Sequence, residues 1–182
     1  MKRLFFITAC AAVLFSSCGK QQESKPFDVR DIDSVTVKDG NKNEVRLSIK
    51  FLLDSTTNDL FQSEEELNQF FEGIVWNLQT ECSNPRSFVP EKIWNVEFVD
   101  TIEYKGEKMF VIKSLVDGVA KNGFGVEGKV SDILNLIAWR EITHFEAEGD
   151  EQAEDWAFWH VMANDKFYLD KIKENIDKRH SK

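Results

Sequence analysis

The clearest periodic pattern in the chain is a stripe of apolar residues with the spacing of one helix face. The members of the stripe are Leu67, Phe70, Phe71, Ile74, Val75 and Leu78. Ser63 and Glu66 precede it and match a capping box, in which each side chain accepts a hydrogen bond from the other residue's backbone N–H. The pattern predicts an amphipathic helix over about residues 64–80 that lays one face on a sheet.

Alternating and β-branched segments predict strands on both sides of this helix. The predicted strands are 34–38, 45–51, 93–104, 108–120 and 133–145. The first two should pair around the turn Asp39-Gly40-Asn41, and 93–104 should pair with 108–120 around Lys105-Gly106-Glu107. In 45–51, the apolar face consists of Val45, Leu47, Ile49 and Phe51. Ser131 also fits as the cap of a short helix over 132–138, and this alternative stays open.

The C-terminal segment 151–178 is interpreted as helical, with a break at Asn164-Asp165. Its second half carries an apolar stripe of Tyr168, Ile172 and Ile176. Its first half is aromatic on more than one side, through Trp156, Phe158, Trp159 and His160. These rings either cover the sheet and core or form an exposed patch for a partner or a sugar. The predicted fold class is α+β, an antiparallel sheet packed by the helix of about 64–80 with C-terminal helices at about 151–178.

The first residues have the pattern of an export signal. A basic start, Met1-Lys2-Arg3, precedes the apolar run Leu4 to Phe15, which is shorter than the roughly 20 residues that span a bilayer. The run ends in Leu14-Phe15-Ser16-Ser17-Cys18, which resembles the lipobox of bacterial lipoproteins. The resemblance implies that residues 1–17 are removed and that Cys18 carries palmitate-type acyl chains. The alternative is ordinary cleavage near Ser17, which would release a soluble secreted protein.

The same resemblance implies a location and a domain organisation. Gly19 after the cysteine is compatible with transfer to an outer membrane, so we expect a lipid-anchored protein on the periplasmic side of a bacterial cell envelope. Residues 1–17 are then the signal peptide, and 18–30 are the lipidated cysteine with a polar, flexible tether. Residues 31–182 are expected to form a single α+β domain.

The charge balance argues against nucleic acid as a partner. The 182 residues contain 23 Lys plus Arg and 32 Asp plus Glu, a net charge of −9. Polyanion binding needs clustered cations instead. Loss of Lys2 and Arg3 with the signal removes two cations, so −9 becomes −11 in the mature chain. We therefore expect an acidic body whose membrane partner is reached through Cys18.

The cysteines leave no pair for an intrachain disulfide. Cys10 would leave with the signal and Cys18 would be acylated, so Cys82 remains alone. A nucleophile or a thiol sensor is possible chemistry for a lone cysteine, but we interpret Cys82 as a small, half-buried residue at a helix end.

Two further motifs are interpreted as structural. The segment 123–129, GFGVEGK, superficially fits phosphate-binding loops, but Val130 stands where magnesium would need Ser or Thr, and Glu127 would repel a phosphate. The acidic run 146–151, with Glu154, Asp155 and His144 nearby, lacks the alternation of a calcium loop. We interpret it as a solvated loop and helix start.

The function is predicted from the export signal and from the motifs that the sequence lacks. The sequence contains no histidines spaced to bind a metal, no nucleophile elbow and no other metal motif, so neither catalysis nor a cofactor is expected. Residues 84–88, NPRSF, and 120–125, AKNGFG, loosely resemble small bacterial extracytoplasmic proteins without an established activity. We expect a non-catalytic module for an envelope protein or small ligand. The alternatives are a cystatin-like or NTF2-like cup that wraps the helix around an apolar ligand, and an uncharacterised hydrolase.

Overall fold

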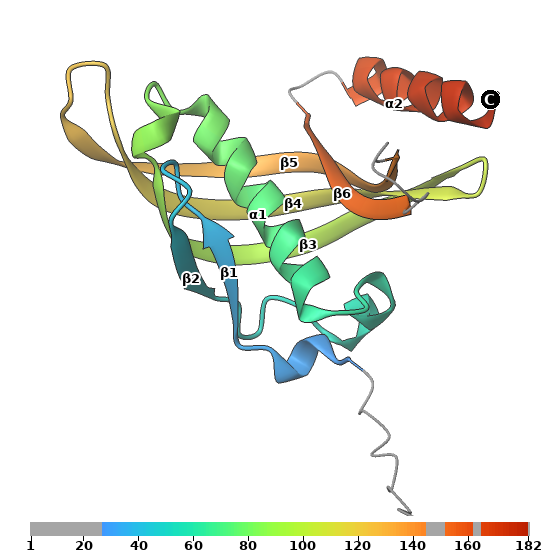
Figure 1. The fold of residues 1–182 in the computed structure, drawn as a ribbon, viewed down its shortest axis with the longest axis horizontal. Helices are drawn as coiled ribbons and strands as arrows, with labels where there is room; N and C mark the ends of the chain where they lie inside the picture. The colour runs from blue at the N-terminus through green and yellow to red at the C-terminus, as the bar shows by residue number, and fades with distance from the viewer. Residues whose placement is uncertain (1–26, 145–151, 162–164, 182) are drawn as a thin grey trace, which may run out of the picture.

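The computed structural model describes residues 27–144, 152–161 and 165–181. The described elements are the 3₁₀ helices η1 (Val29–Asp31), η2 (Ser55–Leu60) and η3 (Pro85–Ser87), the helices α1 (Glu64–Glu81) and α2 (Asp165–His180), and the strands β1 (Ser34–Lys38), β2 (Glu44–Ser48), β3 (Val89–Tyr104), β4 (Glu107–Lys121), β5 (Glu127–His144) and β6 (Gln152–His160). They form an antiparallel sheet in the order β3-β4-β5-β6 and a hairpin of β1 and β2 (Figure 1). The α+β class is confirmed.

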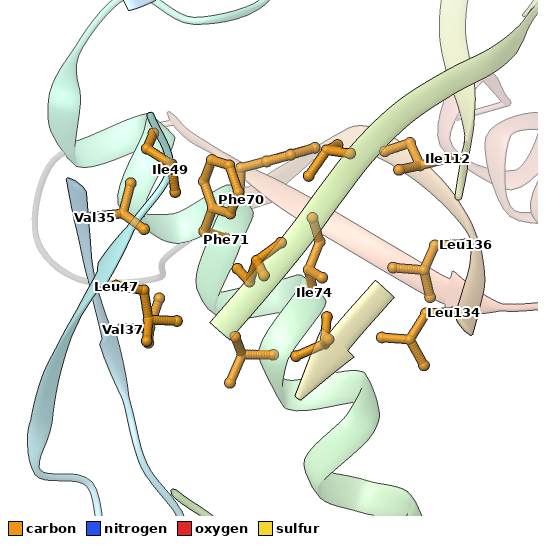
Figure 2. Close-up of a cluster of buried hydrophobic side chains, with 14 of the residues drawn as sticks. Val35, Val37, Leu47, Ile49, Phe70, Phe71, Ile74, Ile112, Leu134 and Leu136 are labelled. Carbon is orange, nitrogen blue, oxygen red and sulfur yellow. The ribbon is translucent and has the colours of Figure 1, made fainter. Parts of the chain in front are cut away.

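Helix α1 forms where the apolar stripe predicts it. Ser63 caps it by accepting a hydrogen bond from the Glu66 backbone N–H at 3.2 Å, while the Glu66 carboxylate accepts from the backbone of Gln62 and not from that of Ser63. Every member of the stripe is buried. Figure 2 shows Phe70, Phe71 and Ile74 between the β1–β2 hairpin and the long sheet. The helix is thus the centre of a three-layer core.

Segment 152–160 is a strand and not the predicted helix. It pairs with β5 from Leu136↔His160 to His144↔Gln152. Trp156 and Phe158 pack toward α1, whereas Ala157 and Trp159 pack in a second cluster with α2. A strand covered on both faces is apolar at odd and even positions, so its pattern resembles that of a buried helix. The helical interpretation holds from Asp165 onward, where Ile172 and Ile176 are buried as predicted; the side chain of Tyr168 and the whole of Asn164 lie outside the described residues.

Strands β3 and β5 begin earlier than predicted, at Val89 and Glu127 rather than at 93 and 133. Two further predictions also differ from the structure. The alternative helix over 132–138 does not form, because this segment belongs to β5 and Ser131 donates its hydroxyl to Asp117 at 2.5 Å. Strand β2 ends at Ser48, and Phe51, predicted on its buried face, is 90% exposed in the following turn.

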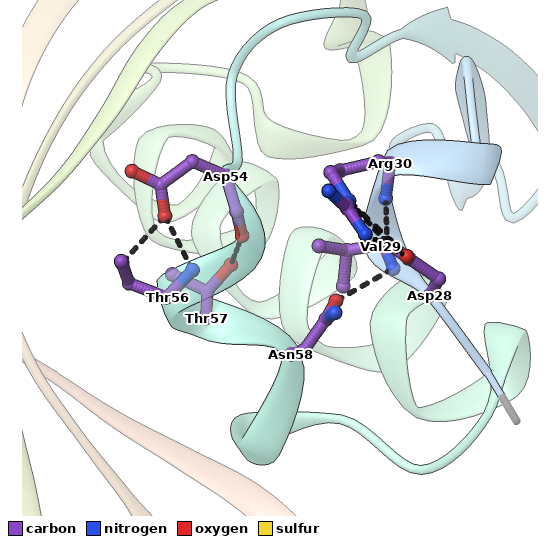
Figure 3. Close-up of polar contacts among 7 residues, drawn as sticks. All are labelled: Asp28, Val29, Arg30, Asp54, Thr56, Thr57 and Asn58. Carbon is purple, nitrogen blue, oxygen red and sulfur yellow. Dashed lines mark hydrogen bonds and ion pairs between the residues drawn. The ribbon is translucent and has the colours of Figure 1, made fainter.

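The body starts before the predicted boundary at residue 31. Val29 is only 2% exposed and lies in the core, and its backbone N–H donates to the side chain of Asn58 at 2.9 Å (Figure 3). Asp28 caps η1 by accepting from the Arg30 backbone. Phe27 also packs against the core. The segment expected to be flexible therefore joins the fold at Phe27.

Candidate functional site

The face of the long sheet that meets α1, here the α1 face, is filled by aromatic rings. The Phe70 ring lies 5.1 Å from Phe61, 5.1 Å from Trp156 and 5.6 Å from Phe158, measured between ring centroids. Tilted and edge-to-face pairs at such distances are favourable contacts. In the cystatin-like or NTF2-like alternative, an apolar ligand would lie between the helix and the sheet. The rings fill this space, so the α1 face forms part of the core.

A half-buried ion pair lies on the α1 face, beside the start of α1. Arg140 lies 2.7 Å from Glu66, donates to the Leu60 carbonyl at 2.8 Å, and stacks 4.3 Å from the centroid of Trp156. Burial raises the pKa of the Glu66 carboxyl, but its hydrogen bonds with Arg140 and Gln62 outweigh burial and hold that pKa below its ordinary value. The pair thereby fastens β5 to the start of α1.

The opposite side, here the α2 face, is covered only in part. Ile172 and Ile176 of α2 pack on Met109, Ile137 and Trp139. Tyr104 donates its hydroxyl to Asp177 at 2.9 Å, and Lys105 lies 2.6 Å from the same carboxylate. The hydrogen bond with Asp177 raises the pKa of Tyr104. Apolar and polar contacts therefore hold α2 on the sheet from Ile172 to Asp177.

A pocket of about 600 Å³ lies on the α2 face, beside the N-terminal part of α2. Its apolar lining includes Val99, Ile102, Val111, Ile137, Val161 and Leu169. Asp100 and Asn135 contribute one carboxylate and one carboxamide among the described lining residues. Small-molecule sites are characteristically concave, mostly apolar, and oriented by a few polar groups. This pocket is therefore the candidate site.

No sequence motif pointed to these lining residues. Val111 of β4 and Ile137 of β5 lie directly opposite each other, and both belong to the alternate positions that face away from α1. The sequence did carry one signal of an apolar second face. Both strands are apolar at odd and even positions, as strands buried on both faces are. The predicted strands contained the pocket residues, but local patterning does not tell a covered face from a partly open one.

The glycine-rich segment forms the tip of the β4–β5 hairpin. Asn122 accepts hydrogen bonds from the backbones of Phe124 at 2.9 Å and Val126 at 3.0 Å, and Gly125 has a φ of 80°. The interpretation as a glycine-rich bend is confirmed. The two loosely resembling segments meet next to this tip, where the Lys121 backbone donates to Ser87 at 2.7 Å.

The remaining candidate residues do not join the pocket. Cys82 is partly buried at the end of α1, and burial, with a smaller contribution from Glu81, raises the pKa of its thiol. His160 contacts Glu81. The acidic run 146–151, the side chains of His144 and His180, and Cys18 lie outside the described part of the chain. Within that part, no three His, Cys, Asp or Glu side chains cluster in a way that could hold a metal ion.

The aromatic residues of β6 serve the core. Trp156 is 9% exposed, and Trp159 packs with the α2 cluster, so the interpretation as sheet cover is confirmed for these two.

Among the described helices, none combines the length and the apolar character needed to cross a bilayer.

No family model, curated protein or solved structure matches this chain. The resemblances to bacterial lipoproteins and to small extracytoplasmic proteins stay predictions.

Proposed function

We propose that this chain is a lipid-anchored extracytoplasmic binding module, held to a bacterial envelope membrane through acylated Cys18. The observation that carries the proposal is the signal-like N-terminus ending in Leu14-Phe15-Ser16-Ser17-Cys18. One acyl chain holds a protein only marginally, whereas two or more anchor it stably. Acylation at this cysteine would therefore determine where the α+β domain works.

The anchor is tested with Cys18→Ala in the native host. The parent should fractionate with membranes, and globomycin, which blocks lipoprotein signal cleavage, should make its precursor accumulate. The variant should lose membrane association. Mass spectrometry of the parent's N-terminal peptide should find acyl chains on Cys18. An unacylated N-terminus downstream of Cys18 would instead establish ordinary secretion.

A small apolar ligand is the binding partner that the pocket on the α2 face favours. About 600 Å³ of apolar space suits an acyl or aromatic group, and Asp100 and Asn135 supply polar contacts for one end of the molecule. The ligand proposal is independent of the anchor, because it rests on the folded domain alone.

The ligand proposal is tested with N-phenyl-1-naphthylamine, a neutral apolar dye that fluoresces when removed from water. The dye should bind saturably, and Val111→Trp, which fills the pocket, should weaken its binding at least tenfold. The matched control is Ile133→Trp, on the same face of the neighbouring strand but outside the pocket lining. Equal binding by both variants would exclude the pocket as the dye's site.

A further inference from the structure

The turn after β2 presents a phenylalanine that the fold does not use. The Leu52 backbone N–H donates to the Ile49 carbonyl at 2.9 Å, and Phe51 has a φ of 70°. A turn with positive φ at its third residue is of type II, where glycine is favoured because a side chain is strained there. Phe51 nevertheless occupies the position with its ring 90% exposed. Neither backbone preference nor core packing accounts for this side chain.

This turn lies at the end of the molecule where the chain enters the fold. Figure 1 places η1 and the connection from β2 to α1 together, away from the tip of the β4–β5 hairpin. Figure 3 shows how the two segments are joined, through Val29 and Asn58, with Asp54 nearby. Asp54 fixes its own segment by accepting from the Thr56 backbone at 2.9 Å. The entry point and the connection that carries Phe51 thus belong to one hydrogen-bonded unit.

The short tether keeps this end near the proposed anchor. Only Gly19 to Pro26 separate Cys18 from Phe27, where the described body begins. Nine residue steps span at most roughly 30 Å at full extension. An acylated Cys18 would therefore hold the Phe51 end close to the bilayer surface.

We propose that, in the anchored protein, the Phe51 ring inserts into the interfacial region of the bilayer that holds Cys18. The inference rests on the proposed function, because it needs the anchor. Burial of one such ring favours the orientation of the domain that places the ring in the bilayer, by about 10- to 100-fold over orientations that leave it in water. That bias is too small to recruit a free acidic body to a membrane, but a short tether supplies a millimolar effective concentration. Phe51 then orients the domain. Lys50, whose amine lies 5.1 Å from the ring centroid, marks the position of the ring and can carry a probe of the contact.

Phe124 provides a matched internal control. Its ring is 95% exposed, as open as that of Phe51, but it lies at the tip of the β4–β5 hairpin, well away from η1 and the β2–α1 connection (Figure 1). General stickiness of an exposed ring would affect both positions equally. Contact with the anchoring bilayer should affect Phe51 alone.

The test uses the acylated mature protein in phosphatidylcholine vesicles that contain doxyl-labelled lipid, with Cys82→Ser to remove the free thiol. An NBD fluorophore on Lys50→Cys should be quenched by the doxyl lipid. Adding Phe51→Gly should reduce the quenching at least threefold without lowering the thermal midpoint, whereas adding Phe124→Gly should leave it unchanged.

The possible failures are distinguishable. Mass spectrometry of the same preparation reports acylation of Cys18, and its absence would overturn both the anchor and the membrane contact. Acylated protein whose probe is not quenched, or is quenched equally with Phe51→Gly, would overturn the contact and leave the anchor standing.

Discussion

The two faces of the long sheet are built from the same strands and used differently. On the α1 face, Phe70 and its neighbouring rings fill the layer between helix and sheet. On the α2 face, α2 covers Met109, Ile137 and Trp139 and leaves a pocket of about 600 Å³ beside them. A filled layer gives stability, while a partly covered one leaves apolar surface for binding. We therefore expect stability to depend on the α1 face and binding on the α2 face.

The largest contrast should come from removing one side chain on each face. Phe70→Ala should lower the free energy of unfolding by about 3–5 kcal/mol, because it empties the centre of a packed layer. Ile176→Ala should cost about 2 kcal/mol, near the low end for buried aliphatic side chains, because a helix docked at one side can readjust. Urea denaturation measures both, and equal losses would contradict the distinction between the faces.

A second prediction tests how tightly the α1 face is packed. A Cβ at Gly73 of α1 would overlap with the Phe158 ring. Helix propensity alone would make Gly73→Ala stabilising by about 1 kcal/mol. Overpacking costs about 1–3 kcal/mol, so we expect a net loss of about 1 kcal/mol. A gain in the thermal midpoint would show that the layer has room to yield.

The Tyr104 contact on the α2 face should give a smaller effect. Tyr104→Phe removes the hydrogen bond to Asp177 and should cost about 0.5–1 kcal/mol. Hydrogen exchange should become faster in α2 and stay unchanged in α1. Faster exchange in both helices would mean that the two faces unfold as one unit.

The smallest expected effect is a difference in pH dependence. The pKa of Glu66 is held below its ordinary value in the folded state, so its contribution is present above pH 4.5 and is lost as pH falls through the lower folded pKa. Glu66→Gln should therefore flatten the loss of stability below pH 4.5. The control is Glu174→Gln on α2, whose pKa is also lowered but whose ion pairs are exposed and screened. An equal effect of both variants would contradict the special role of the Arg140 pair.

Sequence patterning predicted α1, the β1–β2 hairpin and the strands of the long sheet up to β5. The α1 stripe and its Ser63 cap, the β1–β2 hairpin and the β3–β4 turn all form as expected. It failed for segment 152–160, whose two buried faces imitate a helix, and for Phe51, where alternation continues past the end of the strand. The pocket residues were inside predicted strands without being recognisable as a site.

By itself, the sequence determined which segments alternate, where α1 starts, and the acidic charge, because periodicity, capping and composition are local properties of the chain. Only the tertiary structure decided that β6 completes the sheet, that rings fill one face, and that a pocket remains on the other. These outcomes depend on which distant segments meet. A residue such as Val111 cannot encode locally whether α2 or a ligand will cover it.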